Sequence, residues 1–124
     1  MDVTPYFFDT YAFFEIIEGN KNYKKFSEGI ALITTKMNLM ELYYGLAVSY
    51  GKKTAKKYFD KYQEYCIPIS FDLIEKAMDF RLENKGRKLS YADCVGYVLA
   101  KDLGARFLTG DKEFKEMANV EFVK

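Results

Sequence analysis

The sequence predicts an α/β domain with a central, mostly parallel five-stranded sheet and helices on both of its faces. Short runs rich in β-branched and aromatic residues alternate along the whole chain with longer segments of helical spacing. No Pro-, Ser- or Gly-rich linker, repeat or low-complexity stretch interrupts this alternation. A chain of 124 residues can bury about two-thirds of its unfolded surface. We therefore expect residues 1–124 to form one domain with right-handed crossovers.

The strands are expected in five short apolar runs, at residues 3–8, 30–34, 65–69, 105–108 and 120–123. The third run contains the only interior proline, Pro68. Helical segments separate these runs, and parallel strands require such connections.

Helical periodicity is clearest between the second and third strands. Apolar residues there follow an i, i+3, i+4, i+7 pattern, at Leu39, Leu42, Tyr43, Leu46, Ala47 and Tyr50. A less regular pattern covers residues 73–81. A further helix is expected to start after Ser90, because Ser90-x-x-Asp93 has the form of a capping box, and to end before Gly104.

The composition restricts the chemistry. The chain has no histidine, which excludes the commonest general base and every His-containing zinc site. The two cysteines, Cys66 and Cys94, cannot form a CxxC pair or a four-ligand cluster and are expected to be free thiols in a reducing cytosol. Any catalysis must use carboxylates, lysines, hydroxyls or a metal.

Charge and hydropathy point to a soluble, cytoplasmic protein. No apolar stretch approaches the roughly 18 residues of a membrane helix, and the first residues lack a basic leader region. The net charge of +1 argues against a uniformly basic coat for nucleic acid.

Four acidic residues are expected at one edge of the sheet. Asp9 directly follows the first strand and Asp111 follows the strand that ends near Leu108. Asp93 lies in the first turn of a helix, and Glu41 lies early in the helix after residues 30–34. The carboxyl ends of parallel strands share one edge, where ligands bind. The four acids can therefore converge.

Such a cluster needs a counter-charge. Glu41 has apolar helical neighbours at Met37, Tyr44 and Val48, so its carboxylate requires a partner. Two like charges about 4 Å apart repel by around 4 kcal/mol at an effective dielectric of about 20. Either the pKa values rise or a cation binds. An all-oxygen site favours Mg²⁺ or Mn²⁺ and suits attack on phosphodiesters.

Each acid also has a simpler interpretation. Asp9 and Asp111 can cap the helices that follow them, Asp93 can complete a capping box with Ser90, and Glu41 can be solvated. Taken singly, each acid favours that interpretation. Capping does not explain why four acids share one edge.

The residues around these acids resemble known motifs. These are Asp9-Thr10, Thr35-x2-Asn38-x2-Glu41-Leu42-x2-Gly45, Asp93-x6-Ala100 followed by Gly104, and Leu108-Thr109-Gly110-Asp111-x2-Phe114. Over nearly its whole length the chain resembles the PIN-domain ribonucleases, most closely the toxins of VapBC toxin–antitoxin pairs. It departs from them at Tyr11, Tyr97 and Val98, where relatives have smaller residues.

The resemblance implies a Mg²⁺- or Mn²⁺-dependent endoribonuclease that forms a homodimer and is inhibited by a cognate antitoxin. It implies that Asp9, Glu41, Asp93 and Asp111 are the metal-binding and catalytic acids, with Thr109 and Thr10 as supporting hydroxyls. A housekeeping RNA-processing nuclease and a non-catalytic RNA- or protein-binding module on the same fold remain alternatives.

Two basic segments are candidate RNA-binding surfaces. Lys85, Arg87 and Lys88 precede the Asp93 helix, and Lys52 and Lys56 belong to a lysine-rich helix. A solvated helix face explains the second segment equally well. Single-stranded or looped RNA is the expected substrate, because unstacked bases can lie on aromatic rings.

Tyrosines are concentrated between residues 37 and 63. Most are expected in the core, but their number suggests that part of this helix pair forms a groove for an amphipathic partner segment. The candidates are Tyr43, Tyr44, Tyr58 and Tyr62. In the resembling toxins, the C-terminal segment of the antitoxin binds there.

A receiver-like phosphoacceptor domain fits less well. It needs paired acids after the first strand and an acceptor Asp after the third, whereas Phe8 precedes Asp9 and Pro68-Ile69-Ser70 ends the third run. The D-x-D motif of haloacid-dehalogenase-type phosphatases is absent, because Asp9-Thr10-Tyr11 occupies that position.

Overall fold

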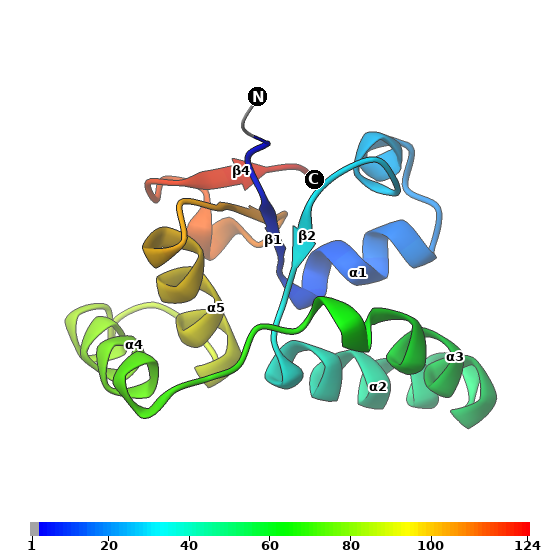
Figure 1. The fold of residues 1–124 in the computed structure, drawn as a ribbon, viewed down its shortest axis with the longest axis horizontal. Helices are drawn as coiled ribbons and strands as arrows, with labels where there is room; N and C mark the ends of the chain where they lie inside the picture. The colour runs from blue at the N-terminus through cyan, green and yellow to red at the C-terminus, as the bar shows by residue number, and fades with distance from the viewer. Residues whose placement is uncertain (1–2) are drawn as a thin grey trace.

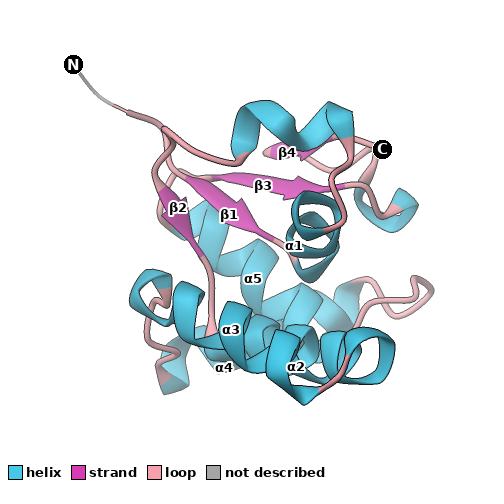
Figure 2. Cartoon of the chain, turned by 90° about the vertical axis from the view of Figure 1, so that its right-hand side faces the viewer, coloured by secondary structure: helices cyan, strands magenta, loops and turns pink. Residues whose placement is uncertain are grey.

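The sheet of the protein has four parallel strands. The computed structural model describes residues 3–124, so residues 1 and 2 of the expected domain lie outside the described part. The strand order is β2-β1-β3-β4 and every neighbouring pair is parallel. Figure 2 shows these strands side by side. Their bounds are β1 Tyr6–Phe8, β2 Leu32–Ile33, β3 Arg106–Thr109 and β4 Val120–Phe122.

The prediction of a fifth strand at residues 65–69 was wrong. This segment makes one isolated parallel bridge, between Thr34 and Cys66. Two backbone bonds support it: the Thr34 N–H donates to the Tyr65 carbonyl at 3.0 Å, and the Ile67 N–H donates to the Thr34 carbonyl at 2.8 Å. Pro68 has no N–H to extend the ladder. The neighbouring strand β2 also ends at Ile33, because the chain turns there into a helix.

The helices fill the connections between the strands, as Figure 1 shows. Their bounds are α1 Thr10–Ile17, η1 Lys21–Phe26, α2 Lys36–Tyr50, α3 Lys52–Tyr62, η2 Gln63–Tyr65, α4 Phe71–Glu83, α5 Tyr91–Asp102 and η3 Lys112–Phe114, where η marks a 3₁₀ helix. The periodicity predicted for residues 39–50 is confirmed, since Leu39, Leu42 and Leu46 are buried. Tyr50, at the end of α2, is exposed.

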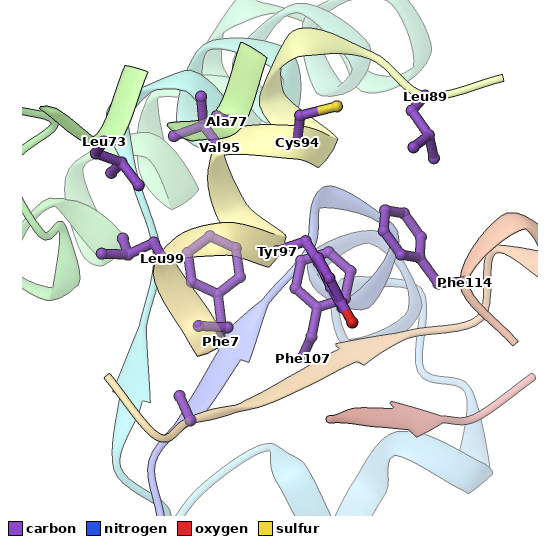
Figure 3. Close-up of a cluster of buried hydrophobic side chains, with 12 residues drawn as sticks. Phe7, Leu73, Ala77, Leu89, Cys94, Val95, Tyr97, Leu99, Phe107 and Phe114 are labelled. Atoms are coloured by element: carbon purple, nitrogen blue, oxygen red, sulfur yellow. The ribbon is translucent and has the colours of Figure 1, made fainter. Parts of the chain in front are cut away.

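One face of the sheet packs against α4 and α5. Phe7 on β1 and Phe107 on β3 are paired in register and stack with their ring centroids 5.6 Å apart. Figure 3 shows these two rings beneath Tyr97 and Leu99 of α5. Gly96 allows this close approach, because a Cβ there would lie 2.6 Å from the Phe7 ring. Helix α5 therefore lies directly on the sheet.

The opposite face carries the other helices. Phe8 and Leu108, the next residues along β1 and β3, belong to a second buried cluster with side chains of α1, η1, α2 and α3. Successive strand residues point to opposite faces, so β1 and β3 contribute to both cores. The prediction of helices on both faces is confirmed.

Two further expectations concern the thiols and the membrane. Both cysteines are free; Cys94 is buried and Cys66 is half-buried. Within residues 3–124, the helices are too short or too polar to span a membrane.

Candidate active site

Asp9 lies at the centre of the carboxyl edge of the sheet, between β1 and α1. Its backbone N–H donates to the carbonyl of Leu108 on β3 at 3.2 Å. As the N-cap of α1, its Oδ1 accepts the Thr10 N–H at 2.8 Å. Its Oδ2 accepts the Thr109 hydroxyl at 2.7 Å. Asp9 is only 3% exposed, and its carboxylate is held by two hydrogen bonds, one from α1 and one from β3.

The pKa values of Asp9 and Asp93 are both raised, by burial and by the charges of neighbouring acids. Burial, followed by the charge of Asp93, raises the pKa of Asp9 to about 8, although hydrogen bonds from Thr109 and Thr10 oppose this shift. Glu41 adds to it. Burial also raises the pKa of Asp93 to about 6, with further contributions from Glu41 and Asp111. Asp93 and Glu41 thus lie close enough to Asp9, and Glu41 and Asp111 close enough to Asp93, for their charges to raise these two pKa values.

Asp93 and Asp111 both take part in helix capping, as the simpler interpretation of these acids proposed. The Ser90 N–H donates to Asp93 Oδ2 at 2.8 Å and the Asp93 N–H donates to Ser90 Oγ at 3.0 Å, which completes the capping box of α5. Asp111 Oδ1 accepts the Glu113 N–H at 3.0 Å at the start of η3.

Capping leaves a free oxygen on each of these carboxylates. Within the described residues, Asp93 Oδ1 and Asp111 Oδ2 accept no hydrogen bond from the protein. One oxygen thus fixes each side chain, and the other keeps its lone pairs available. Helix capping therefore leaves one oxygen of each carboxylate available to a ligand.

Thr109 joins two of the acids. Its hydroxyl donates to Asp9 Oδ2, and its oxygen accepts the Asp111 N–H at 3.0 Å. Thr109 is fully buried at the end of β3. It therefore sets the position of Asp111 relative to Asp9.

Glu41 is positioned by a chain of polar groups between α1 and α2. The Thr10 hydroxyl donates to Glu41 Oε1 at 2.6 Å and accepts the Asn38 side-chain N–H at 3.2 Å. Asn38 in turn accepts the Thr35 hydroxyl at 2.7 Å. Asn38 and Thr35 are fully buried. The partner that Glu41 requires is thus Thr10.

Two sequence-based expectations around Glu41 need revision. Tyr44 and Val48 are 73% and 70% exposed, so the apolar stripe beside Glu41 faces solvent and does not bury the carboxylate. Asn38 and Thr35 appeared in the sequence only as motif residues, without a role. The signal for them was the spacing: Thr35 is the N-cap of α2, and its side chain accepts the N–H of Asn38.

The donor set fits a hydrated divalent cation. None of the ion pairs in the described part of the chain involves the four acids. Across residues 3–124, no group of three or more acidic or thiol side chains has a geometry that could hold an ion as it stands. Mg²⁺ is commonly bound by one or two carboxylates together with water and phosphate oxygens. Pairs from Asp9, Glu41, Asp93 and Asp111 supply that kind of ligation.

The basic loop before α5 lies next to Asp111. Lys85, Arg87 and Lys88 are exposed there. The Arg87 Nη1 donates to the Glu113 carbonyl at 2.8 Å, and the Lys88 N–H donates to Glu113 Oε1 at 3.4 Å. Glu113 lies in η3, two residues after its N-cap Asp111, so this loop lies next to Asp111.

Lys52 and Lys56 of α3 make no comparable hydrogen bond to the segment around Asp111 within the described residues. Lys52 and Lys56 are exposed, and Lys56 forms a surface ion pair with Asp60 at 2.8 Å. An exposed i, i+4 pair of this kind belongs to a solvated helix face.

A groove lies between α2 and α3, but most of the tyrosines predicted to line a partner groove lie elsewhere. A groove of about 830 Å³ between α2 and α3 is lined by Lys36, Leu39, Met40, Tyr43, Lys56, Phe59, Gln63 and Cys66. Tyr43 is the only predicted tyrosine in this lining. Tyr44 faces solvent, Tyr58 is half-buried, and Tyr62 is a core residue at 6% exposure whose ring centroid lies 4.7 Å from that of Phe13.

Comparison with known proteins identifies a family and a fold. A family model described as the PIN domain matches residues 6–120. Comparison with curated proteins gives no match.

Similar solved structures include VapC20 of Mycobacterium tuberculosis, a sarcin-ricin loop cleaving toxin. It is 19% identical with a TM-score of 0.80, and the match covers 95% of this chain and 96% of that one. VapBC2 from Rickettsia felis, bound to a DNA fragment from its promoter, is 21% identical with a TM-score of 0.72, covering 97% and 98%. A toxin–antitoxin complex from Klebsiella pneumoniae is 19% identical with a TM-score of 0.73, covering 93% and 94%. At these identities the likeness establishes the fold.

Proposed function

Because the chain belongs to the PIN domain family, we propose that it is a divalent-metal-dependent endoribonuclease whose active site comprises Asp9, Glu41, Asp93 and Asp111. Asp9 carries this proposal. It is a buried carboxylate with a pKa raised to about 8, it is coupled to Asp93 and Glu41, and it makes no ion pair within the described residues. A buried carboxyl whose pKa is raised this far and is coupled to other acids is typical of a functional site.

In this mechanism, hydrogen bonds from neighbouring residues fix the orientation of the carboxylates. Thr10 and Thr109 fix Asp9, Ser90 fixes Asp93, and the backbone of η3 fixes Asp111. When bound, Mg²⁺ or Mn²⁺ supplies polarisation of the scissile phosphate and a lowered pKa for an attacking water. Without a cation, Asp9 keeps its proton below a pH of about 8, so cation binding must release protons.

The substrate that fits is single-stranded or looped RNA. The loop with Lys85, Arg87 and Lys88 places positive charge beside Asp111, where a phosphate backbone would enter. Unpaired nucleotides can reach carboxylates at the sheet edge more easily than a duplex can.

We further propose that the protein is the toxin of a toxin–antitoxin pair, acting in the cytoplasm as a homodimer. The fold matches VapC20, and complexes of the VapBC type share it. The groove between α2 and α3 offers apolar side chains of Leu39, Met40 and Phe59 to an amphipathic antitoxin segment. Co-purification with a small protein, weakened by Met40→Glu, supports this assignment, whereas unchanged co-purification contradicts it.

The deciding experiment compares RNA cleavage by the wild type with cleavage by Asp9→Asn. Structured and single-stranded RNAs are incubated with Mg²⁺ or Mn²⁺, and the product ends are mapped. Asp79→Asn, which changes an exposed acid on α4, is the matched control. We expect cleavage by the wild type and the control, and none by Asp9→Asn or in EDTA. Cleavage that persists in EDTA or in Asp9→Asn would overturn the proposal.

A further inference from the structure

A second basic surface lies on η1 and the C-terminal residue. It consists of Lys21, Lys24, Lys25 and Lys124, which are all exposed, and we name it the η1 lysine patch. Lys21, Lys24 and Lys25 line a surface hollow of about 590 Å³ together with Asn22 and Val123. None of the ion pairs in residues 3–124 involves these lysines. Their charges are therefore available to a ligand.

The patch is built on a firmly held segment. Tyr23 and Phe26 of η1 are buried in the core of the domain. The Tyr23 hydroxyl donates to the Val123 carbonyl, and the side-chain amide of Asn22 donates to the Lys124 carbonyl at 3.1 Å. The lysines of η1 and the C-terminal segment are thus fixed relative to each other.

Tyr11 links the patch to the acids. The Lys124 ammonium lies 5.9 Å from the centroid of the Tyr11 ring. The same ring packs so closely on Gly110, the residue before Asp111, that a Cβ at Gly110 would overlap it. Tyr11 itself directly follows Thr10, which holds Glu41. Tyr11 therefore lies between Gly110, next to Asp111, and Lys124 of the patch.

The patch and the loop at residues 85–88 lie on different sides of β1, the strand that precedes Asp9. In Figure 1, η1 and the C-terminus lie on one side of β1, and the connection between α4 and α5 lies on the other. A polyanion that crosses the carboxylate edge can therefore meet lysines both before and after it.

Building on the proposed nuclease function, we infer that the η1 lysine patch binds the backbone of single-stranded RNA on one side of the scissile phosphate. The phosphates contact the lysines of η1, and Tyr11 provides a ring beside the acids on which a base can stack. The η1 lysine patch is thus a second RNA-binding surface, in addition to the loop at residues 85–88.

The test removes charge from the patch and, separately, from a matched surface. K21Q/K24Q/K25Q is compared with K52Q/K53Q/K57Q on α3, which also removes three exposed lysine charges. Both sets are made in the Asp9→Asn background, so that the RNA is not cut. Binding of a labelled oligo-uridine of about 20 nucleotides is followed by fluorescence anisotropy over a range of salt concentrations.

We expect the patch variant to lower the slope of log Kd against log salt by about 2, because each single-strand phosphate contact contributes about 0.7. The α3 variant should change the slope by less than about half that amount. With Asp9 intact, the patch variant should lower kcat/KM for the long RNA and leave cleavage of a tetranucleotide unchanged.

Two results overturn the inference about the patch alone. One is a patch variant whose slope of log Kd against log salt equals that of the wild type. The other is an α3 variant whose slope falls as much as that of the patch variant. If the wild type cleaves RNA while either is observed, the proposed nuclease function stands without the patch. A wild-type protein that neither binds nor cleaves RNA overturns both.

Discussion

The buried carboxylate of Asp9 makes a quantitative prediction about stability. Without metal, its pKa is about 8 in the folded protein, against an ordinary value of 3.8. Between these two values, the folded state binds one more proton than the unfolded state. The free energy of unfolding must therefore fall as pH rises through this window, and it levels off above a pH of about 8.

The magnitude follows from the size of the shift. Each pH unit within the window lowers the free energy of unfolding by about 1.4 kcal/mol. From pH 5 to pH 7, Asp9 thus contributes a fall of about 3 kcal/mol. Asp93, with a folded pKa of about 6, adds about 1.4 kcal/mol over the first of these two units. In Asp9→Asn the larger contribution disappears, so the fall should shrink from about 4 to about 1.4 kcal/mol.

The assay is urea unfolding in EDTA at pH 5, 6 and 7, followed by circular dichroism. The chain has no histidine, so the side chain that usually titrates in this range does not contribute. Asp79→Asn should keep the wild-type pH dependence. Saturating Mg²⁺ should flatten the wild-type curve, because the cation holds Asp9 ionised.

The reasoning is refuted if the metal-free wild type is as stable at pH 7 as at pH 5. It is equally refuted if Asp9→Asn shows the full wild-type fall. Either result would mean that the proton on Asp9 is not linked to folding.

Further predictions concern the residues that hydrogen-bond to the acids and the effect of adding Mg²⁺. Thr10→Ala removes the hydrogen-bond partner of Glu41 and should lower RNA cleavage by about 10- to 100-fold. Thr10→Ser keeps the hydroxyl and should restore cleavage. Equal activity of the two variants would show that the hydroxyl is not needed. Ser90→Ala should cost about 1 kcal/mol of stability in thermal unfolding through loss of the α5 cap, and an unchanged Tm would argue against the capping box. Gly110→Ala should cost about 1–3 kcal/mol, because its Cβ overlaps the ring and the carbonyl that pack there, whereas Gly86→Ala, in open space, is the neutral control. Mg²⁺ at about 100 times its Kd should stabilise the wild type by about 2.7 kcal/mol, and calorimetry should show no such gain in Asp9→Asn.

Much of the fold was predictable because its signals are local. Alternating apolar runs and helical periodicity indicated a parallel sheet with covered faces, and the order of the acids along the chain placed them at one edge. The prediction of a fifth strand was wrong because strand pairing depends on the neighbouring strand as well as on the segment itself. Residues 65–69 have strand-like composition, but their neighbour β2 ends at Ile33, so only one bridge forms.

The surfaces were harder to predict because exposure depends on packing between helices. Tyr62 looks like its tyrosine neighbours in the sequence, yet its ring packs from the end of α3 against Phe13 of α1. Lys21, Lys24 and Lys25 are spread over a short 3₁₀ helix, and only the fold brings Lys124 beside them.

The sequence by itself determined the chemistry of this protein: no histidine, four carboxylates in a fixed order, and an α/β chain that carries them to one sheet edge. These features can be deduced from residue types and local periodicity alone. Only the tertiary structure decided how the carboxylates are held, through Thr109 between Asp9 and Asp111 and through Thr10 beneath Glu41. These hydrogen bonds join residues up to 100 positions apart in the chain, and the burial that raises the pKa of Asp9 exists only after those segments have packed together.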